Sequence, residues 1–108
     1  MRITTDNIAL RDLLESGRTD DKHLRKLPKS AISGFLKAVH IIAISSRVED
    51  LFRYKGLNYE ALEGNLKGFE SVRCDKKYRL VFKSFPDEDK IVITNVELIN
   101  ITNHYGKI

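Results

Sequence analysis

The stretch FESVRCDKKYRLVF, residues 69–82, decides the fold, because apolar and polar residues alternate on both sides of a short polar turn. This alternation predicts two antiparallel strands that each bury one face. If the apolar side chains of both strands share that face, Cys74 lies opposite Tyr78 and the turn consists of residues 75–77. A two-residue turn at positions 76–77 would place the apolar side chains of the two strands on opposite faces. The pattern therefore predicts a hairpin with a three-residue turn.

This register places Arg73 directly across from Arg79 on the polar face of the hairpin. Two like charges in this position destabilise a sheet unless something separates them. One interpretation is that an anion lies between the two guanidinium groups, since arginine binds phosphate in a bidentate manner. The other is that two solvated arginines bend apart and pair with Glu60 or Glu97. The pattern alone leaves both interpretations open.

The first half of the chain is predicted to be helical. Thr5 or Asp6 is expected to cap a helix that ends at Gly17. A second helix is expected to begin near Pro28, because proline suits the first turn. Apolar side chains recur at helical spacing in both segments, namely Ile8, Leu10, Leu13 and Leu14 in the first and Ile32, Phe35, Leu36, Val39, Ile42 and Ala43 in the second.

A further strand is predicted from roughly Lys90 to Glu97, after a turn at residues 86–89, because β-branched residues are frequent there. The fold class is therefore α+β, with two N-terminal helices packed on one face of a small, mainly antiparallel twisted sheet. The chain contains no repeat and no linker-like stretch, so residues 1–108 are expected to form one domain.

Composition excludes several classes of protein. The chain has 108 residues and a single cysteine, so it has no internal disulfide, and no Cys/His cluster has the spacing of a zinc site. No signal-peptide pattern is present and the longest apolar run, near residues 38–44, is too short to span a bilayer. We therefore expect a cytoplasmic protein without metal, cofactor or membrane association.

The net charge is +4, from 19 Lys and Arg against 15 Asp and Glu. Between Lys22 and Val48 the chain carries six basic residues and no acidic residue. Such a segment suits a polyanion, since lysine and arginine replace the counterions of phosphates. A solvated helix face or a face for an acidic protein partner would have the same composition.

Three segments resemble the RelE/ParE superfamily of bacterial toxins, and within it the HigB and YoeB types. They are LNYEALEGNLKGFESVR at 57–73, KYRLVF at 77–82 and NHYGKI at 103–108. The resemblance implies a RelE-like fold and the toxin of a type II toxin–antitoxin system. It further implies an endoribonuclease that cleaves messenger RNA on the ribosome through attack of a ribose 2′-OH on the adjacent phosphate, without a metal.

The resemblance also implies roles for five residues. Glu60 takes the position of the YoeB-type general base, Arg79 would stabilise the phosphorane, and Arg73 would hold a phosphate. His104 would protonate the leaving group or share the role of the base, and Tyr105 would stack on a base of the RNA. Apart from the resemblance, Glu60 is interpreted as a surface carboxylate and the last two residues as a frayed chain end.

Five lysines are candidate phosphate contacts, although most surface lysines are only solvated: Lys67, Lys76, Lys77, Lys29 and Lys37. Glu63 stands where many relatives carry a lysine, which removes one such contact. The resemblance implies messenger RNA on the ribosome and a cognate antitoxin with a helix-turn-helix domain as partners.

Two other functions share these sequence features. A ParE-like toxin has the same fold but inhibits gyrase by binding, without nuclease activity. A non-catalytic nucleic-acid-binding module would use the basic segment around residues 22–37. For such a module, charge reversal on that segment would abolish function while Arg79→Ala would not, and the nuclease predicts the opposite ranking.

Overall fold

The computed structural model describes residues 1–88 and 90–103. Their strands form one five-stranded sheet in the order β1-β5-β4-β3-β2. Two α-helices, α1 (Ile8–Ser16) and α2 (Lys29–Ile44), precede most of the sheet along the chain. The strands are β1 (Arg2–Thr5), β2 (Glu60–Ala61), β3 (Glu70–Arg73), β4 (Arg79–Pro86) and β5 (Ile93–Thr102). Short 3₁₀ turns connect them, namely η1 (Leu24–Lys26), η2 (Val48–Arg53), η3 (Lys55–Leu57) and η4 (Gly64–Leu66).

The hairpin register predicted from the sequence is confirmed. Arg73 pairs with Arg79, and the backbone N–H of Cys74 donates to the carbonyl of Tyr78 over 2.9 Å. The turn is held by Asp75, whose Oδ1 accepts from the backbone N–H groups of Lys77 (2.9 Å) and Tyr78 (2.8 Å). Its other oxygen, Oδ2, accepts from the hydroxyl of a serine in the first turn of α2 at 2.8 Å, so the turn is also joined to that helix.

The α+β class and the mainly antiparallel sheet are confirmed, but three strands differ from the predictions. The strand expected from about Lys90 to Glu97 is β5, which begins at Ile93 and continues to Thr102. A register shift opposite Val81 and Phe82 inserts an extra residue into β5 and changes which face its side chains occupy. This bulge breaks the period of two, which explains why the second half of the strand was missed. Two further strands were not predicted, namely β1, which pairs with β5 in parallel, and the two-residue β2, which pairs antiparallel with β3.

The first helix begins one or two residues later than expected. Asn7 caps it, because its side chain accepts from the backbone N–H of Leu10 at 3.3 Å. The expected cap Thr5 instead ends β1 and donates its hydroxyl to the carbonyl of Leu98 over 2.9 Å, so neither Thr5 nor Asp6 is the cap. Gly17 ends the helix as predicted, with a left-handed φ of 74°.

The second helix begins after Pro28, as predicted, but it buries a different stripe of side chains. Leu36 and Ala43, expected in the core, are exposed. The buried residues of α2 are Ala31, Phe35, Ala38, Val39, Ile41 and Ile42. Small alanines bring the helix close to the sheet, and at Gly34 a Cβ atom would overlap the carbonyl group of Cys74. The helix thus packs directly on the backbone of the hairpin.

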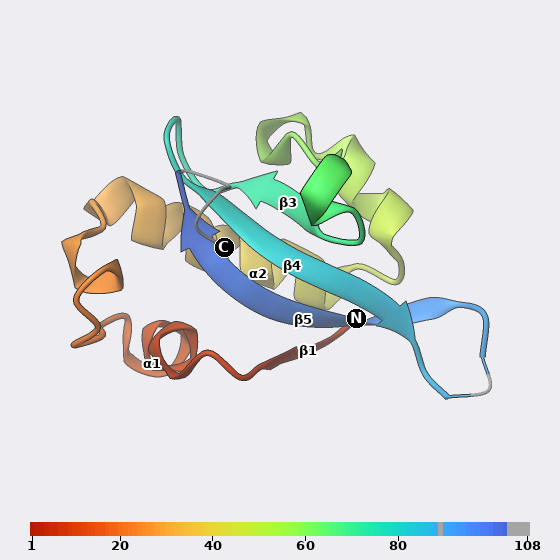
Figure 1. Cartoon of the computed structure of the whole chain (residues 1–108), viewed down its shortest axis with the longest axis horizontal. Helices are drawn as coiled ribbons and strands as arrows, with labels where there is room; N and C mark the ends of the chain where they lie inside the picture. Colours follow the sequence, from red (N-terminus) through yellow and green to blue (C-terminus); the bar gives the residue numbers. More distant parts are fainter. Residues whose placement is uncertain (89, 104–108) are drawn as a thin grey trace.

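The core lies between the sheet and the helices. Phe35 and Phe82 are among its largest fully buried side chains, and Leu10 and Leu13 of α1 complete it. In Figure 1, α2 lies behind the sheet and η4 lies in front of β3. The two faces of the sheet therefore differ: one contacts the helices, and the other carries the arginines of the hairpin.

Candidate active site

The face of the sheet that carries Arg73 and Arg79 is termed the arginine face. Directly paired residues point to the same side of a sheet, so the register lists the members of this face row by row. One row is Arg73, Arg79 and Thr102 across β3, β4 and β5. The adjacent row is Glu60, Ser71, Val81 and Asn100 across β2, β3, β4 and β5. Two predicted site arginines and the predicted base thus come from neighbouring rows of one face.

Arg79 is held by hydrogen bonds to the backbone and to a serine. Its Nε donates to the hydroxyl of Ser71 over 2.9 Å, and its Nη2 donates to the carbonyls of Asn58 and Ser71. Asn58 adopts a left-handed conformation with φ 44° and ψ 56°, a region that asparagine tolerates better than most residues. This turn directs the Asn58 carbonyl to the guanidinium and leads the chain into β2.

The two arginines therefore do not face each other as an equal pair. Arg79 is half-buried and leans toward Ser71, whereas Arg73 is exposed. Neither of them forms an ion pair with Glu60 or Glu97 within residues 1–88 and 90–103. The pairing with these carboxylates, one of the two interpretations left open by the sequence, is therefore not found there. Arg79 instead bends toward Ser71, and Arg73 extends into solvent.

Glu60 is exposed at the start of β2, directly opposite Ser71. Because Ser71 also accepts from Arg79, these three residues form a diagonal across three strands. The face thus carries a proton acceptor and an oriented positive charge, the two kinds of group that general base catalysis next to a phosphate uses.

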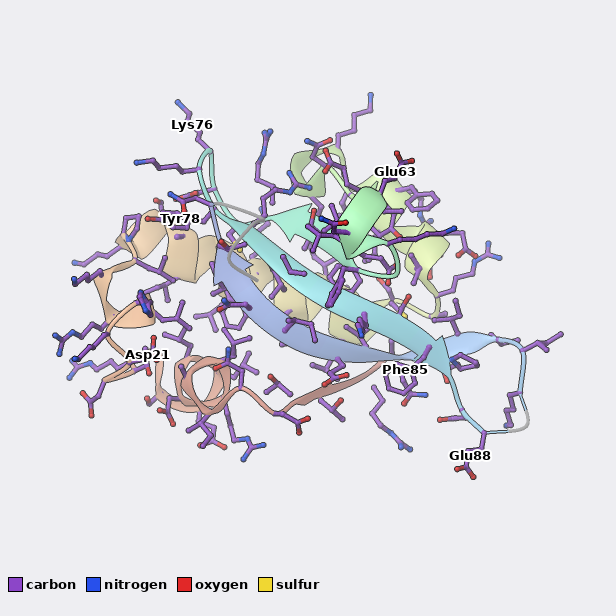
Figure 2. All side chains as sticks on the ribbon, in the orientation of Figure 1. Asp21, Glu63, Lys76, Tyr78, Phe85 and Glu88 are labelled. Carbon is purple, nitrogen blue, oxygen red and sulfur yellow. The ribbon has the colours of Figure 1, made fainter. Side chains whose placement is uncertain are left out.

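The predicted lysines lie in three different parts of the fold. Lys76 and Lys77 lie in the turn between β3 and β4, which connects Arg73 to Arg79, and Figure 2 shows Lys76 at the tip of this hairpin. Lys67 follows η4. In contrast, Lys29 and Lys37 belong to α2, which packs on the other face of the sheet. Lys76 and Lys77 therefore lie close to the arginines in the fold, whereas Lys29 and Lys37 are separated from them.

The two remaining predicted residues, His104 and Tyr105, lie outside the described residues. The last described strand, β5, ends at Thr102, the residue paired with Arg79. A cavity of about 480 Å³ opens beside this strand end. Its lining includes His23 and Tyr78 together with Asn100 and Thr102 of the arginine face.

Sequence reasoning missed the residues that position Arg79. Ser71 and Asn58 lie within the stretches quoted above, but the sequence predicts no role for either. Strand alternation alone predicts that Ser71 lies on the same face as Arg73, because it is two residues before it in the strand. No sequence signal identifies the Asn58 carbonyl, because a backbone acceptor depends on the conformation of the chain.

Neither a metal site nor a membrane span is found in the part of the chain that the structure describes. No cluster of three or more His, Cys, Asp or Glu side chains there has the geometry to hold a metal ion. No helix within these residues is long and apolar enough to cross a bilayer.

The sequence is similar to those of known toxins. Residues 10–98 match the model of the RelE-like toxin of the type II toxin–antitoxin system HigB. Toxin HigB-1 of Vibrio cholerae is 39% identical over 70 residues, which cover 65% of this chain and 74% of that protein.

Two solved structures have the same fold. The YoeB/ParE toxin from Agrobacterium tumefaciens aligns with a TM-score of 0.54 at 18% identity, covering 97% of this chain and all of that one. The YoeB dimer from Staphylococcus aureus aligns with a TM-score of 0.51 at 19% identity, covering 97% and 98%.

Proposed function

Because this chain belongs to the HigB family of RelE-like toxins from type II toxin–antitoxin systems, we propose that it is an endoribonuclease that cleaves messenger RNA on the translating ribosome. A toxin of this type has a cognate antitoxin as partner. The proposal places the protein in the cytoplasm, where translation occurs, and gives the antitoxin a helix-turn-helix domain that represses the shared operon.

The proposed reaction is transfer within the RNA strand. The ribose 2′ oxygen attacks the adjacent phosphorus, the bond to the 5′ oxygen breaks, and a cyclic phosphate and a 5′-OH end remain. Glu60 removes the 2′ proton, and His104 protonates the leaving oxygen. Each of these proton transfers contributes about 10²- to 10⁴-fold to the rate. Positive charge for the phosphorane comes from arginine, so no metal takes part in the proposed step.

The observation that carries this proposal is the fixation of Arg79. Its guanidinium is oriented by Ser71 and the Asn58 carbonyl before any substrate binds. A charge that is already oriented costs no reorganisation when the phosphorane forms, which is the basis of electrostatic catalysis. The exposed side chain of Arg73 is available to hold the scissile or a flanking phosphate, and Tyr105 would stack on a base.

The first test adds purified protein to a cell-free translation reaction and maps the 5′ ends of the message. Wild type is compared with Arg79→Ala and with Arg18→Ala, which removes an exposed arginine outside the sheet. We expect wild type and Arg18→Ala to produce new 5′-OH ends within translated codons. We expect Arg79→Ala to lower the cleavage rate by about 10²- to 10³-fold.

Intact message with undisturbed translation would refute the nuclease. A gyrase supercoiling assay would then test whether the chain acts as a ParE-like inhibitor. Cleavage of free RNA at the same sites and rates would leave the nuclease in place but refute its dependence on the ribosome.

A further inference from the structure

The arginine face continues along β4 beyond the site. Side chains alternate along a strand, so Arg79, Val81, Lys83 and Phe85 all point to this face. Val81 is buried, whereas Lys83 and Phe85 are exposed. Phe85 shows 41% of its surface and lies at the opposite end of β4 from Tyr78, as Figure 2 shows. The cation of Lys83 and the aromatic ring of Phe85 thus follow Arg79 along the same face of β4.

Lys83 is placed by an aromatic ring and not by a carboxylate. Its Nζ lies 4.5 Å from the centroid of the Phe69 ring, a cation–π geometry. Glu97 is directly opposite Lys83 on β5, yet no ion pair joins them among the residues that the structure describes. Phe69 precedes β3, two residues before Ser71, so it belongs to the same face. The ring thereby places the ammonium group over the face, and no direct ion pair within the described part of the chain compensates its charge.

We propose that Lys83, supported by Phe69, forms a second RNA subsite, in which its ammonium binds a backbone phosphate and the Phe85 ring stacks on a base. This inference rests on the proposed function, because it extends the path of the RNA from the scissile phosphate at Arg79. Lys83 lies four positions after Arg79 on the strand, which corresponds to a distance of about 13 Å. A single strand needs more than one nucleotide to cover this distance, so the subsite recognises a flanking nucleotide.

Exposed lysines and aromatic rings on a common line are the elements with which proteins bind single strands without reading sequence. The lysine supplies charge for a phosphate and the ring supplies a stacking surface for any base. The subsite therefore contributes affinity and register on the message, whereas chemistry stays at Arg79 and Glu60.

The test measures binding and cleavage separately. Binding of a fluorescent single-stranded oligoribonucleotide with 2′-O-methyl riboses, which cannot be cleaved, is followed by anisotropy at several salt concentrations. The variants are Lys83→Ala, Phe69→Leu and Phe85→Leu, and the matched control is Lys55→Ala, an exposed lysine of η3. Cleavage in the translation reaction is measured for the same set as the apparent KM and kcat for the message.

We expect Lys83→Ala to lower the slope of log affinity against log salt by about 0.7, the value for one phosphate contact on a single strand. We expect it to raise the apparent KM several-fold with little change in kcat. Phe69→Leu should weaken binding in the same direction, because the ring that positions the ammonium is lost. Phe85→Leu should weaken binding without changing the slope, and Lys55→Ala should match wild type.

The subsite is refuted if wild type binds no RNA at low salt, or if Lys83→Ala keeps the wild-type slope. It is also refuted if the Lys83 and Phe69 variants weaken binding of the antitoxin and not of RNA, since the face would then be a protein interface. A Lys83-dependent slope in a protein that cleaves no message would refute the nuclease and keep the subsite. If Lys83→Ala cleaves the message with the KM and kcat of wild type, the subsite is refuted and the nuclease is not.

Discussion

The Nε of Arg79 donates to the hydroxyl of Ser71 over 2.9 Å, so Arg79 bends away from Arg73, the residue directly opposite it. The bend has two consequences. It separates two like charges that the hairpin register places across from each other, and it fixes one of them in a defined orientation. The fixed charge is the feature from which the proposed chemistry follows.

Removal of this hydrogen bond tests the role of Ser71 in positioning Arg79. Ser71→Ala is expected to lower kcat for message cleavage about 10- to 100-fold with a smaller effect on KM, because a hydrogen bond to a charged group contributes about 1.5–3 kcal/mol. Ser84→Ala is the matched control, since Ser84 donates to Glu70 over 2.6 Å on the other face of β4. Equal losses in both variants, measured beside their Tm values, would show that the effect of Ser71→Ala is only structural.

A methyl group at Gly34 is expected to destabilise the fold strongly. Its Cβ would overlap the carbonyl of Cys74, and α2 and β3 are both too firmly packed to separate without loss of core contacts. We expect Gly34→Ala to lower the free energy of unfolding by about 3 kcal/mol. Gly56→Ala provides the comparison, because nothing lies within 4 Å of the added atom. Urea unfolding measures both, and equal midpoints would contradict the close approach of helix and hairpin.

Asp75 is expected to make stability depend on pH in the acid range. Partial burial by itself would raise the pKa of Asp75, but the backbone N–H groups of Tyr78 and Lys77 and the hydroxyl of Ser30 outweigh it and lower this pKa. The folded state therefore binds its proton less readily than the unfolded state. The stabilisation is fully present above the unfolded pKa and is lost as the pH falls through the folded pKa.

Thermal unfolding of wild type and Asp75→Asn between neutral pH and pH 3 measures this contribution. The variant should have a lower Tm at neutral pH and a smaller further decrease on acidification, because it has lost the carboxylate that titrates. Parallel curves for the two proteins would show that the turn does not depend on the charge of Asp75.

Cys74 is expected to react slowly with thiol reagents. Burial, together with the nearby charge of Asp75, raises the pKa of its thiol to about 12. Since the thiolate is the reactive form, the folded protein at pH 8 should react about a thousandfold more slowly than a free thiol. Denaturant should restore the ordinary rate. A fast reaction in native buffer, followed by absorbance of the released reagent, would contradict the packing of Cys74 against α2.

Local patterns were sufficient for the hairpin register and for the approximate positions of the two helices, but not for the cap of α1 or the buried stripe of α2. The strand period of two, together with a polar turn, determined that Arg73 faces Arg79, since any other register would have buried charges. Pro28 and Gly17 marked one end of each helix, because their backbone preferences act within a single turn. Family resemblance added Glu60 and the C-terminal pair, of which only Glu60 lies in the described chain.

Tertiary structure decided the features that depend on segments distant in the sequence. The parallel pairing of β1 with β5 joins residues 2–5 to residues 95–98, and no local pattern encodes such a partner. The buried stripe of α2 is set by how closely Gly34 lets the helix approach the hairpin, which moves Leu36 into solvent. The separation of Lys29 and Lys37 from the arginines follows from the same docking.

By itself, then, the sequence determined the α+β class, the hairpin register and the residue types of the site. The orientation of Arg79 was decided only by the tertiary structure, because its acceptors are a hydroxyl on another strand and the Asn58 carbonyl, 21 residues away in the chain. Alternation assigns a side chain to a face of a sheet. The direction in which a long, charged side chain bends on that face depends on the acceptors that the rest of the fold brings to it.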